Sequence, residues 1–149
     1  MTTDPLAFLR AAHTTAEARA EAAAARAWSG EWEYDHMVRE IRDLSNGNEL
    51  AQIHLPEIGH FVEANDPAAV LRHIEAERKQ IELHATVENH GRFSERGCDA
   101  DCDGDHYMPP VCRSCRNYAG DPIEAPCPTV EILAEGWGWT SDTPDPNGQ

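Results

Sequence analysis

All five cysteines of the chain lie in one stretch, between Cys98 and Cys127. Cys112 and Cys115 form a C-x2-C pair, a spacing at which two thiolates can bind one metal ion while backbone N–H groups donate to the sulfurs. Cys127 directly precedes a predicted helix, whose partially positive N-terminal end favours the thiolate form. Residue type and spacing therefore predict that these three cysteines bind a metal ion.

The residues alone leave the fourth ligand open. Structural zinc sites take four cysteine or histidine ligands, and the candidates near the three cysteines are Cys98, Cys102, His84, His90 and His106. Cys98 and Cys102 have three interpretations. In the first they complete a four-cysteine site with the C-x2-C pair, which would release Cys127 and His84. In the second they share another metal ion with His90 or His106. In the third they are unliganded thiols on an acidic loop.

An H-x-E sequence, His73 to Glu75, could also combine with the C-x2-C pair. Zinc deaminases join H-x-E to P-C-x2-C, with the glutamate as general acid and base. Here the proline is displaced to Pro110, His73 is predicted in the middle of a helix, and Glu75 falls on the polar side of that helix. A zinc hydrolase or deaminase is therefore the least favoured functional hypothesis, and the sequence predicts no catalytic residues.

The pattern of residues 5–64 predicts a helix, short strands and a helical turn ahead of the candidate ligands. Residues 5–28 have the periodicity of a helix that is capped by Asp4 and carries a narrow stripe of small apolar residues. Residues 31–55 predict two or three short antiparallel strands around an Asn-Gly turn. Residues 57–64 predict a helical turn that leads into the next element.

A long central helix over residues 66–85 is the element that the sequence supports best. Asn65 or Asp66 would cap it, and its apolar residues fall on one arc at the helical repeat: Val70, Leu71, Ile74 and Ile81. Residues 128–135 predict a short C-terminal helix. The expected fold is therefore α+β, with an N-terminal helix, a small antiparallel sheet, the central helix, a zinc-knuckle region and the C-terminal helix.

The length of 149 residues makes one domain the default. We expect a single α+β domain over residues 1–135, with a zinc-binding region at about 84–135, followed by a flexible tail at 136–149. Trp137 and Trp139 could anchor a partner, but we favour the interpretation that they cap a small core.

Composition limits the functions that are open to the chain. It carries 12 Lys and Arg against 27 Asp and Glu, a net charge of −15, so direct binding of nucleic acid is not expected. No apolar run is long enough to span a membrane, and the N-terminus lacks the pattern of a secretory signal. We therefore expect the protein in the reducing cytoplasm, where clustered cysteines indicate metal binding rather than disulfides.

Large apolar side chains are scarce, which makes a metal ion useful to the fold. Leu, Ile, Val and Phe together account for 24 of the 149 residues. Such a chain can bury little apolar surface, so a metal site that joins its elements would supplement the core.

Several blocks of the sequence resemble a known family. These blocks are DPLAFLRA at residues 4–11, NDPAAVLRHIEA at 65–76, a histidine at the end of the following helix, the C-x2-C pair, and PCPTVEILA at 126–134. Their order is similar to that of an uncharacterised actinobacterial and actinophage family, the domain of unknown function 6221. The resemblance covers most of residues 4–135, but the stretch Gly97–His106, with two further cysteines, departs from it.

The resemblance implies an architecture and a ligand set but no activity. It favours His84 as the fourth ligand, together with Cys112, Cys115 and Cys127. A metal ion there would tie the end of the central helix to the cysteine region, and a three-cysteine, one-histidine site leaves no coordination position for a substrate. If the chain is encoded by a phage, the expected location is the host cytoplasm.

These observations predict a small cytoplasmic protein with a structural zinc site that acts as a protein-interaction or accessory module. A protein partner is expected. The alternative is an acidic mimic of nucleic acid that inhibits a basic host protein, because a charge of −15 attracts basic surfaces.

Overall fold

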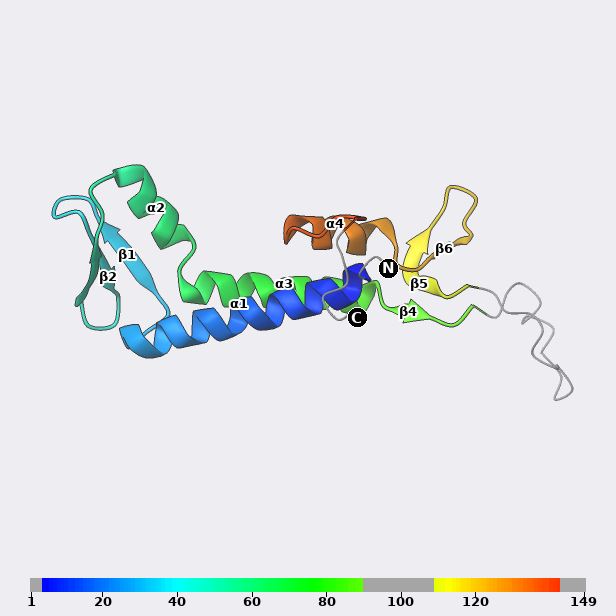
Figure 1. Cartoon of the computed structure of the whole chain (residues 1–149), viewed down its shortest axis with the longest axis horizontal. Helices are drawn as coiled ribbons and strands as arrows, with labels where there is room; N and C mark the ends of the chain where they lie inside the picture. Colours follow the sequence, from blue (N-terminus) through cyan, green and yellow to red (C-terminus); the bar gives the residue numbers. More distant parts are fainter. Residues whose placement is uncertain (1–3, 90–108, 143–149) are drawn as a thin grey trace, which may run out of the picture. The chain divides into compact units, whose positions relative to one another are not determined.

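The computed structural model describes residues 4–89 and 109–142. Helices and small antiparallel sheets occur together in these residues, so the fold class is α+β, as predicted (Figure 1). The chain divides into two compact units. We call Arg10–Arg78 the sheet unit, and Met1–Leu9 with Lys79–Gln149 the cysteine unit. That residues 1–135 form a single domain remains a prediction.

Helix α1 (Pro5–Ala27) begins at its predicted cap. The Asp4 carboxylate accepts hydrogen bonds from the backbone N–H groups of Leu6 and Ala7, at 3.3 and 3.2 Å. The helix ends before Trp28, whose φ of 68° lies in the left-handed region and breaks the helical repeat.

Helix α3 (Pro67–Leu83) is the predicted central helix, and Asp66 is the cap. The Asp66 carboxylate accepts hydrogen bonds from the backbone N–H of Ala69, at 2.6 Å, and from that of Trp32, at 3.1 Å. This residue therefore starts the helix and also joins it to the first strand of the sheet unit.

The sheet unit contains the predicted strands as one antiparallel sheet of order β1-β2-β3. Its strands are β1 (Trp32–Asp35), β2 (Glu40–Asp43) and β3 (Glu49–Gln52).

Helix α2 packs on one face of this sheet. The helix is longer than the single turn expected there and spans Pro56–Ala64. A Cβ atom built on Gly59 would lie 2.4 Å from ring atoms of Tyr34. Glycine therefore lets the helix approach the sheet closely.

Buried Asp43 joins the sheet to the end of α1. Its carboxylate accepts hydrogen bonds from the backbone N–H groups of Ser29 and Ser45, both at 2.8 Å, and from the Ser45 hydroxyl. Burial acts to raise the pKa of Asp43, but the hydrogen bonds from Ser45 and Ser29 hold it below its usual value. The charged form is therefore the stable one in the folded sheet unit.

Two side-chain contacts join α1 to α3 within the sheet unit. His13, which is 1% exposed, contacts the Glu77 carboxylate at 2.7 Å. The Arg78 guanidinium donates to both carboxylate oxygens of Glu17, at 2.8 and 2.6 Å.

The cysteine unit contains a second antiparallel sheet, of order β4-β5-β6, and helix α4 (Pro128–Gly136). The strands are β4 (Thr86–Val87), β5 (Val111–Arg116) and β6 (Pro122–Glu124). The residue pattern did not predict this sheet, because β4 is two residues long and β5 lacks an apolar alternation. The C-terminal helix lies where it was predicted.

Two buried clusters form the core of the cysteine unit. One consists of Leu9, Ile81, Ala134 and Trp139. Trp139 is 8% exposed, which confirms that it packs on the core, while residues 143–149 of the predicted tail lie outside the described residues.

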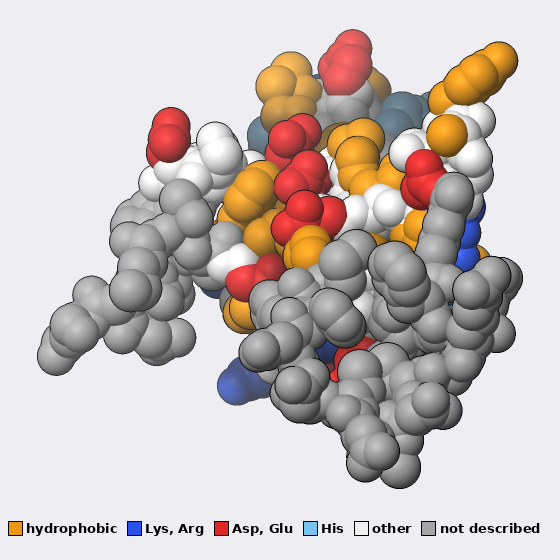
Figure 2. Space-filling view, turned by 90° about the vertical axis from the view of Figure 1, so that its right-hand side faces the viewer, with side chains coloured by type: hydrophobic (Ala, Val, Ile, Leu, Met, Phe, Trp, Pro, Cys, Tyr) orange, Lys and Arg blue, Asp and Glu red, His pale blue; other side chains and the backbone are white. Residues whose placement is uncertain are grey.

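On the face that Figure 2 shows, acidic side chains lie among hydrophobic ones and few Lys or Arg side chains are visible. Of the helices in residues 4–89 and 109–142, none combines the length and the apolar character needed to cross a membrane.

Candidate metal centre

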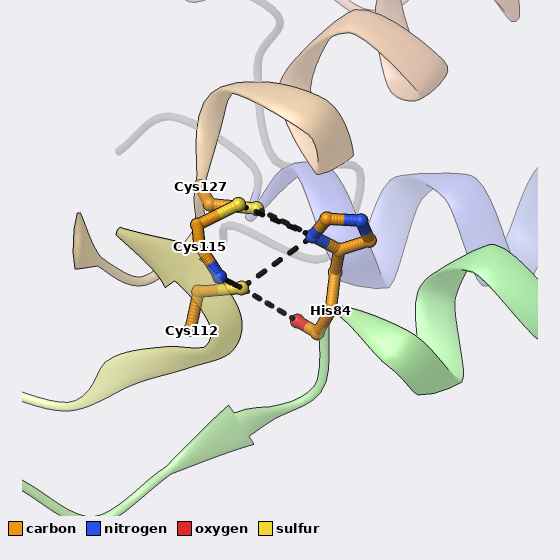
Figure 3. A group of neighbouring side chains, drawn as sticks. All are labelled: His84, Cys112, Cys115 and Cys127. Atoms are coloured by element: carbon orange, nitrogen blue, oxygen red, sulfur yellow. Dashed lines mark hydrogen bonds between the residues drawn. The ribbon is translucent and has the colours of Figure 1, made fainter. Parts of the chain in front are cut away.

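Four side chains of the cysteine unit converge on one point (Figure 3). His84 lies one residue beyond the end of α3, Cys112 and Cys115 lie on β5, and Cys127 is the N-cap residue of α4. One ligand atom from each of the four lies within 4.8 Å of the others. This arrangement could hold a metal ion.

The distances around the His84 imidazole fit a tetrahedral ion. Its Nδ1 atom lies 3.5 Å from the sulfur of Cys112, 3.3 Å from that of Cys115 and 3.5 Å from that of Cys127. Zinc–sulfur and zinc–nitrogen bonds of ordinary length, at a tetrahedral angle, place nitrogen and sulfur about 3.6 Å apart. The three near-equal distances therefore match the edges of a tetrahedron of ligands.

Strand pairing places the histidine beside the C-x2-C pair. Thr86 of β4 is paired with Cys112 of β5, and the Arg113 N–H donates to the Ala85 carbonyl at 2.9 Å. The Ser114 hydroxyl donates to the carbonyl of Leu83, the last residue of α3. These bonds fix the residues on both sides of His84 against the strand that carries two of the thiols.

The turn around the two cysteines is held by its own backbone. The Cys115 N–H donates to the Cys112 sulfur at 3.4 Å, the arrangement expected of a metal-binding C-x2-C pair. One nitrogen of the Arg116 guanidinium donates to the carbonyls of Cys115 and Arg113, at 2.7 and 3.2 Å. The sequence analysis did not identify this role for Arg116, since an arginine after a C-x2-C pair has no distinctive spacing.

The thiols belong to the core of the unit. Cys112 and Cys127 are each 1% exposed and form a buried cluster with Val130, against which Leu6 and Ile123 pack. Two of the candidate ligands are thus part of the buried core of the unit.

The two thiols of the C-x2-C pair differ in acidity. Burial raises the pKa of Cys112, but the N–H groups of Cys115 and Ser114 and the side chains of His84 and Cys127 outweigh it and lower this pKa to about 6. Burial, together with the neighbouring Cys127 and Cys112, raises the pKa of Cys115 to about 11. A thiolate at one of these positions thus opposes deprotonation of the neighbouring thiol. A bound cation would offset this repulsion and allow the thiols to be deprotonated together.

The structure brings together the four residues that were predicted as the ligand set, and Cys127 and His84 both belong to it. The other candidate ligands lie outside the described residues: Cys98, Cys102, His90 and His106. The four-residue group does not include His73 or Glu75, which are both exposed residues of α3.

The model of a family of unknown function, DUF6221, matches residues 2–138. The chain belongs to this family. The match spans all four residues of the metal centre and both units. No curated protein and no solved structure matches the chain. Membership in DUF6221 brings no activity with it, so a function must be argued from the site and the surface.

Proposed function

We propose that this DUF6221 chain is a small cytoplasmic accessory protein whose cysteine unit is stabilised by a structural zinc ion, and that it acts by binding another protein. Near-equal distances from His84 Nδ1 to three sulfurs, at tetrahedral spacing, carry the zinc part of the proposal. Three thiolates and one imidazole are ligands that favour zinc over magnesium, calcium or manganese.

A structural role fits the ligand count and the position of the site. Four protein ligands fill a tetrahedral ion, whereas a catalytic zinc keeps one position for water or substrate. When bound, the ion would join the end of α3, strand β5 and the start of α4. Of these segments, β5 and the start of α4 also meet in a small buried cluster.

Metal analysis of purified, untagged protein tests this proposal. Each of the five cysteines is changed to serine in turn. We expect one zinc per wild-type chain and its loss in Cys112→Ser, Cys115→Ser and Cys127→Ser. Cys98→Ser and Cys102→Ser are the matched controls and should keep the metal. A wild-type protein that binds no metal, or controls that lose it, would contradict the proposal.

A catalytic zinc makes a different prediction for the same site. It requires a bound water and only three protein ligands. Changing His84 to Ala would then be expected to abolish activity toward a small amide or ester. For a structural site the same change removes one of four ligands and weakens zinc binding, with no activity to lose.

One observation favours the acidic-mimic alternative. The face of the sheet opposite α2 carries four carboxylates around one guanidinium: Glu33, Asp35, Glu40 and Glu49 around Arg42. Arg42 is paired with Glu40 at 2.8 Å and Asp35 at 3.6 Å, so the face keeps a net negative charge. A complex formed through this face should weaken steeply as salt is raised. An association that does not depend on salt would exclude this alternative.

A further inference from the structure

Helix α2 exposes a row of large apolar side chains. Leu55, the N-cap residue, is 58% exposed, Ile58 is 48% exposed and Phe61 is 67% exposed. Residues three apart are neighbours on the surface of a helix, so these side chains form a continuous apolar ridge. Gly59 is buried against Tyr34 of the sheet. Phe61, two residues further along α2, therefore lies on the side of the helix that faces away from the sheet.

The turn between β1 and β2 also exposes apolar side chains. The Ile53 N–H donates to the Arg39 carbonyl at 2.8 Å, which places the turn beside the residues that lead into α2 (Figure 1). Met37 and Val38 in this turn are 78% and 45% exposed. We call the five exposed residues the α2 surface: Met37, Val38, Leu55, Ile58 and Phe61.

An apolar surface of this kind is unusual in this chain. Leu, Ile, Val and Phe make up 24 of its 149 residues, and the α2 surface leaves four of these residues and a methionine together in water. Contiguous exposed apolar side chains with a polar border mark sites of protein interaction.

The charges around the α2 surface indicate what it binds. The chain contains no Lys or Arg between Arg42 and Arg72, while Glu57 and Glu63 lie on α2 itself. The one Lys or Arg that is adjacent in sequence to a residue of the α2 surface is Arg39, which follows Val38 in the β1–β2 turn. A second copy of this chain would bring like charges together, whereas a partner with cations beside an apolar stripe is complementary.

We propose that the α2 surface binds a helix of a partner protein that carries an apolar stripe bordered by Lys or Arg. An exposed helix ridge of this spacing packs against the apolar face of an amphipathic helix. The proposal rests on the binding role given above but not on the zinc site, because every residue of the α2 surface belongs to the sheet unit.

Synthetic helical peptides of about 18 residues, long enough to form a helix, test this proposal on the full-length, zinc-loaded protein. The first has Leu on one face and Lys on the other. In the second Glu replaces Lys, and in the third Gln replaces Leu. Fluorescence anisotropy gives the affinities and amide chemical shifts locate the site. We expect the Leu/Lys peptide to bind most tightly and to shift residues 37–38 and 55–62.

Single substitutions then separate this surface from unspecific attraction to an acidic protein. Phe61→Ser and Ile58→Ser should each weaken the Leu/Lys peptide by about tenfold. Ile132→Ser on α4 removes a side chain that is 65% exposed in the other unit and is the matched control. It should leave the affinity unchanged. Thermal melts check that all three variants fold.

Three results would overturn the proposal. One is equal affinity of the Leu/Lys peptide for wild type and Phe61→Ser, and another is equal binding of the Glu peptide. The third is a dimer in sedimentation that Phe61→Ser dissociates, because the occupant would then be a second copy. Metal content is read on the same samples. A protein that binds the peptide but contains no zinc refutes only the structural-zinc proposal. A protein that contains zinc but does not bind the peptide refutes only the proposal for the α2 surface.

Discussion

The two units hold their buried polar side chains differently: in the sheet unit two buried carboxylates accept backbone hydrogen bonds, whereas in the cysteine unit two buried thiols face one imidazole. The Asp43 and Asp66 carboxylates are buried, and each accepts hydrogen bonds from backbone N–H groups. The sulfurs of Cys112 and Cys127 are equally buried, but they surround one imidazole nitrogen. A protein poor in large apolar residues thus uses hydrogen bonds in one unit and a ligand cluster in the other.

Removal of metal should give the largest difference between the two units. A strong chelator is expected to unfold residues 86–135, because structural zinc contributes apparent folding free energy of about 10 kcal/mol or more. Amide spectra of isotope-labelled protein should lose the dispersed signals of β5 and α4. The signals of Ser29 and Ser45, which bond to Asp43, should persist, and added zinc should restore the spectrum. Native dispersion without metal would show that the cysteine unit folds on packing alone.

Substitution of Gly59 should affect the sheet unit. An added Cβ would lie 2.4 Å from the Tyr34 ring, so Gly59→Ala is expected to destabilise the protein by about 1–3 kcal/mol. Gly136→Ala in α4 is the matched control, since a Cβ there meets nothing within 4 Å. Denaturant unfolding measures both. Equal stabilities would mean that α2 is not packed closely on the sheet.

Acid should act on the cysteine unit before the sheet unit. Protons compete with zinc for the thiolates, so zinc binding is expected to weaken progressively as the pH falls. The stabilisation from the Asp43 carboxylate is lost over a lower range of pH. Because its folded pKa is below the ordinary 3.8, the contribution is present above that pH and is lost as the pH falls through the folded pKa. Zinc release and near-ultraviolet circular dichroism over a pH series give the order.

Variant Asp43→Asn sharpens that comparison. The amide of asparagine does not ionise, so the acid-dependent part of sheet-unit stability that comes from Asp43 should be lost, while zinc release keeps its pH dependence. If the variant and the wild type show the same acid profile in the sheet unit, Asp43 is not the group responsible.

The ion pair between Glu17 and Arg78 should give the smallest effect. Both residues lie partly in solvent, where water and salt screen the pair. Glu17→Gln is therefore expected to lower the free energy of unfolding by less than Gly59→Ala does. The effect of Glu17→Gln should become smaller as the salt concentration is raised. A double-mutant cycle with Arg78→Gln measures the pair itself.

The sequence predicted the metal centre more fully than the sheet that holds it. Cys112, Cys115 and Cys127 are set by local spacing and by the helix that follows, so no long-range contact is needed to find them. His84 follows from the end of the central helix and from the family resemblance. Strand β4 has two residues, and its pairing with β5 depends on contacts that residue periodicity does not encode.

Contacts between distant residues set the parts that were not predicted. Gly59 and Tyr34 are separated by 25 positions in the sequence, and nothing local indicates that the glycine meets the ring. The Asn-Gly turn, by contrast, predicted strands β2 and β3 correctly, because a turn and its flanking strands are a local pattern.

X-ray absorption at the zinc edge of the purified protein tests the central claim most directly. The account predicts a shell of three sulfurs at about 2.3 Å and one nitrogen at about 2.0–2.1 Å. The nitrogen contribution should be lost in His84→Ala. A first shell made mainly of oxygen, a bound water in place of His84, or no zinc in the wild-type protein would contradict the account.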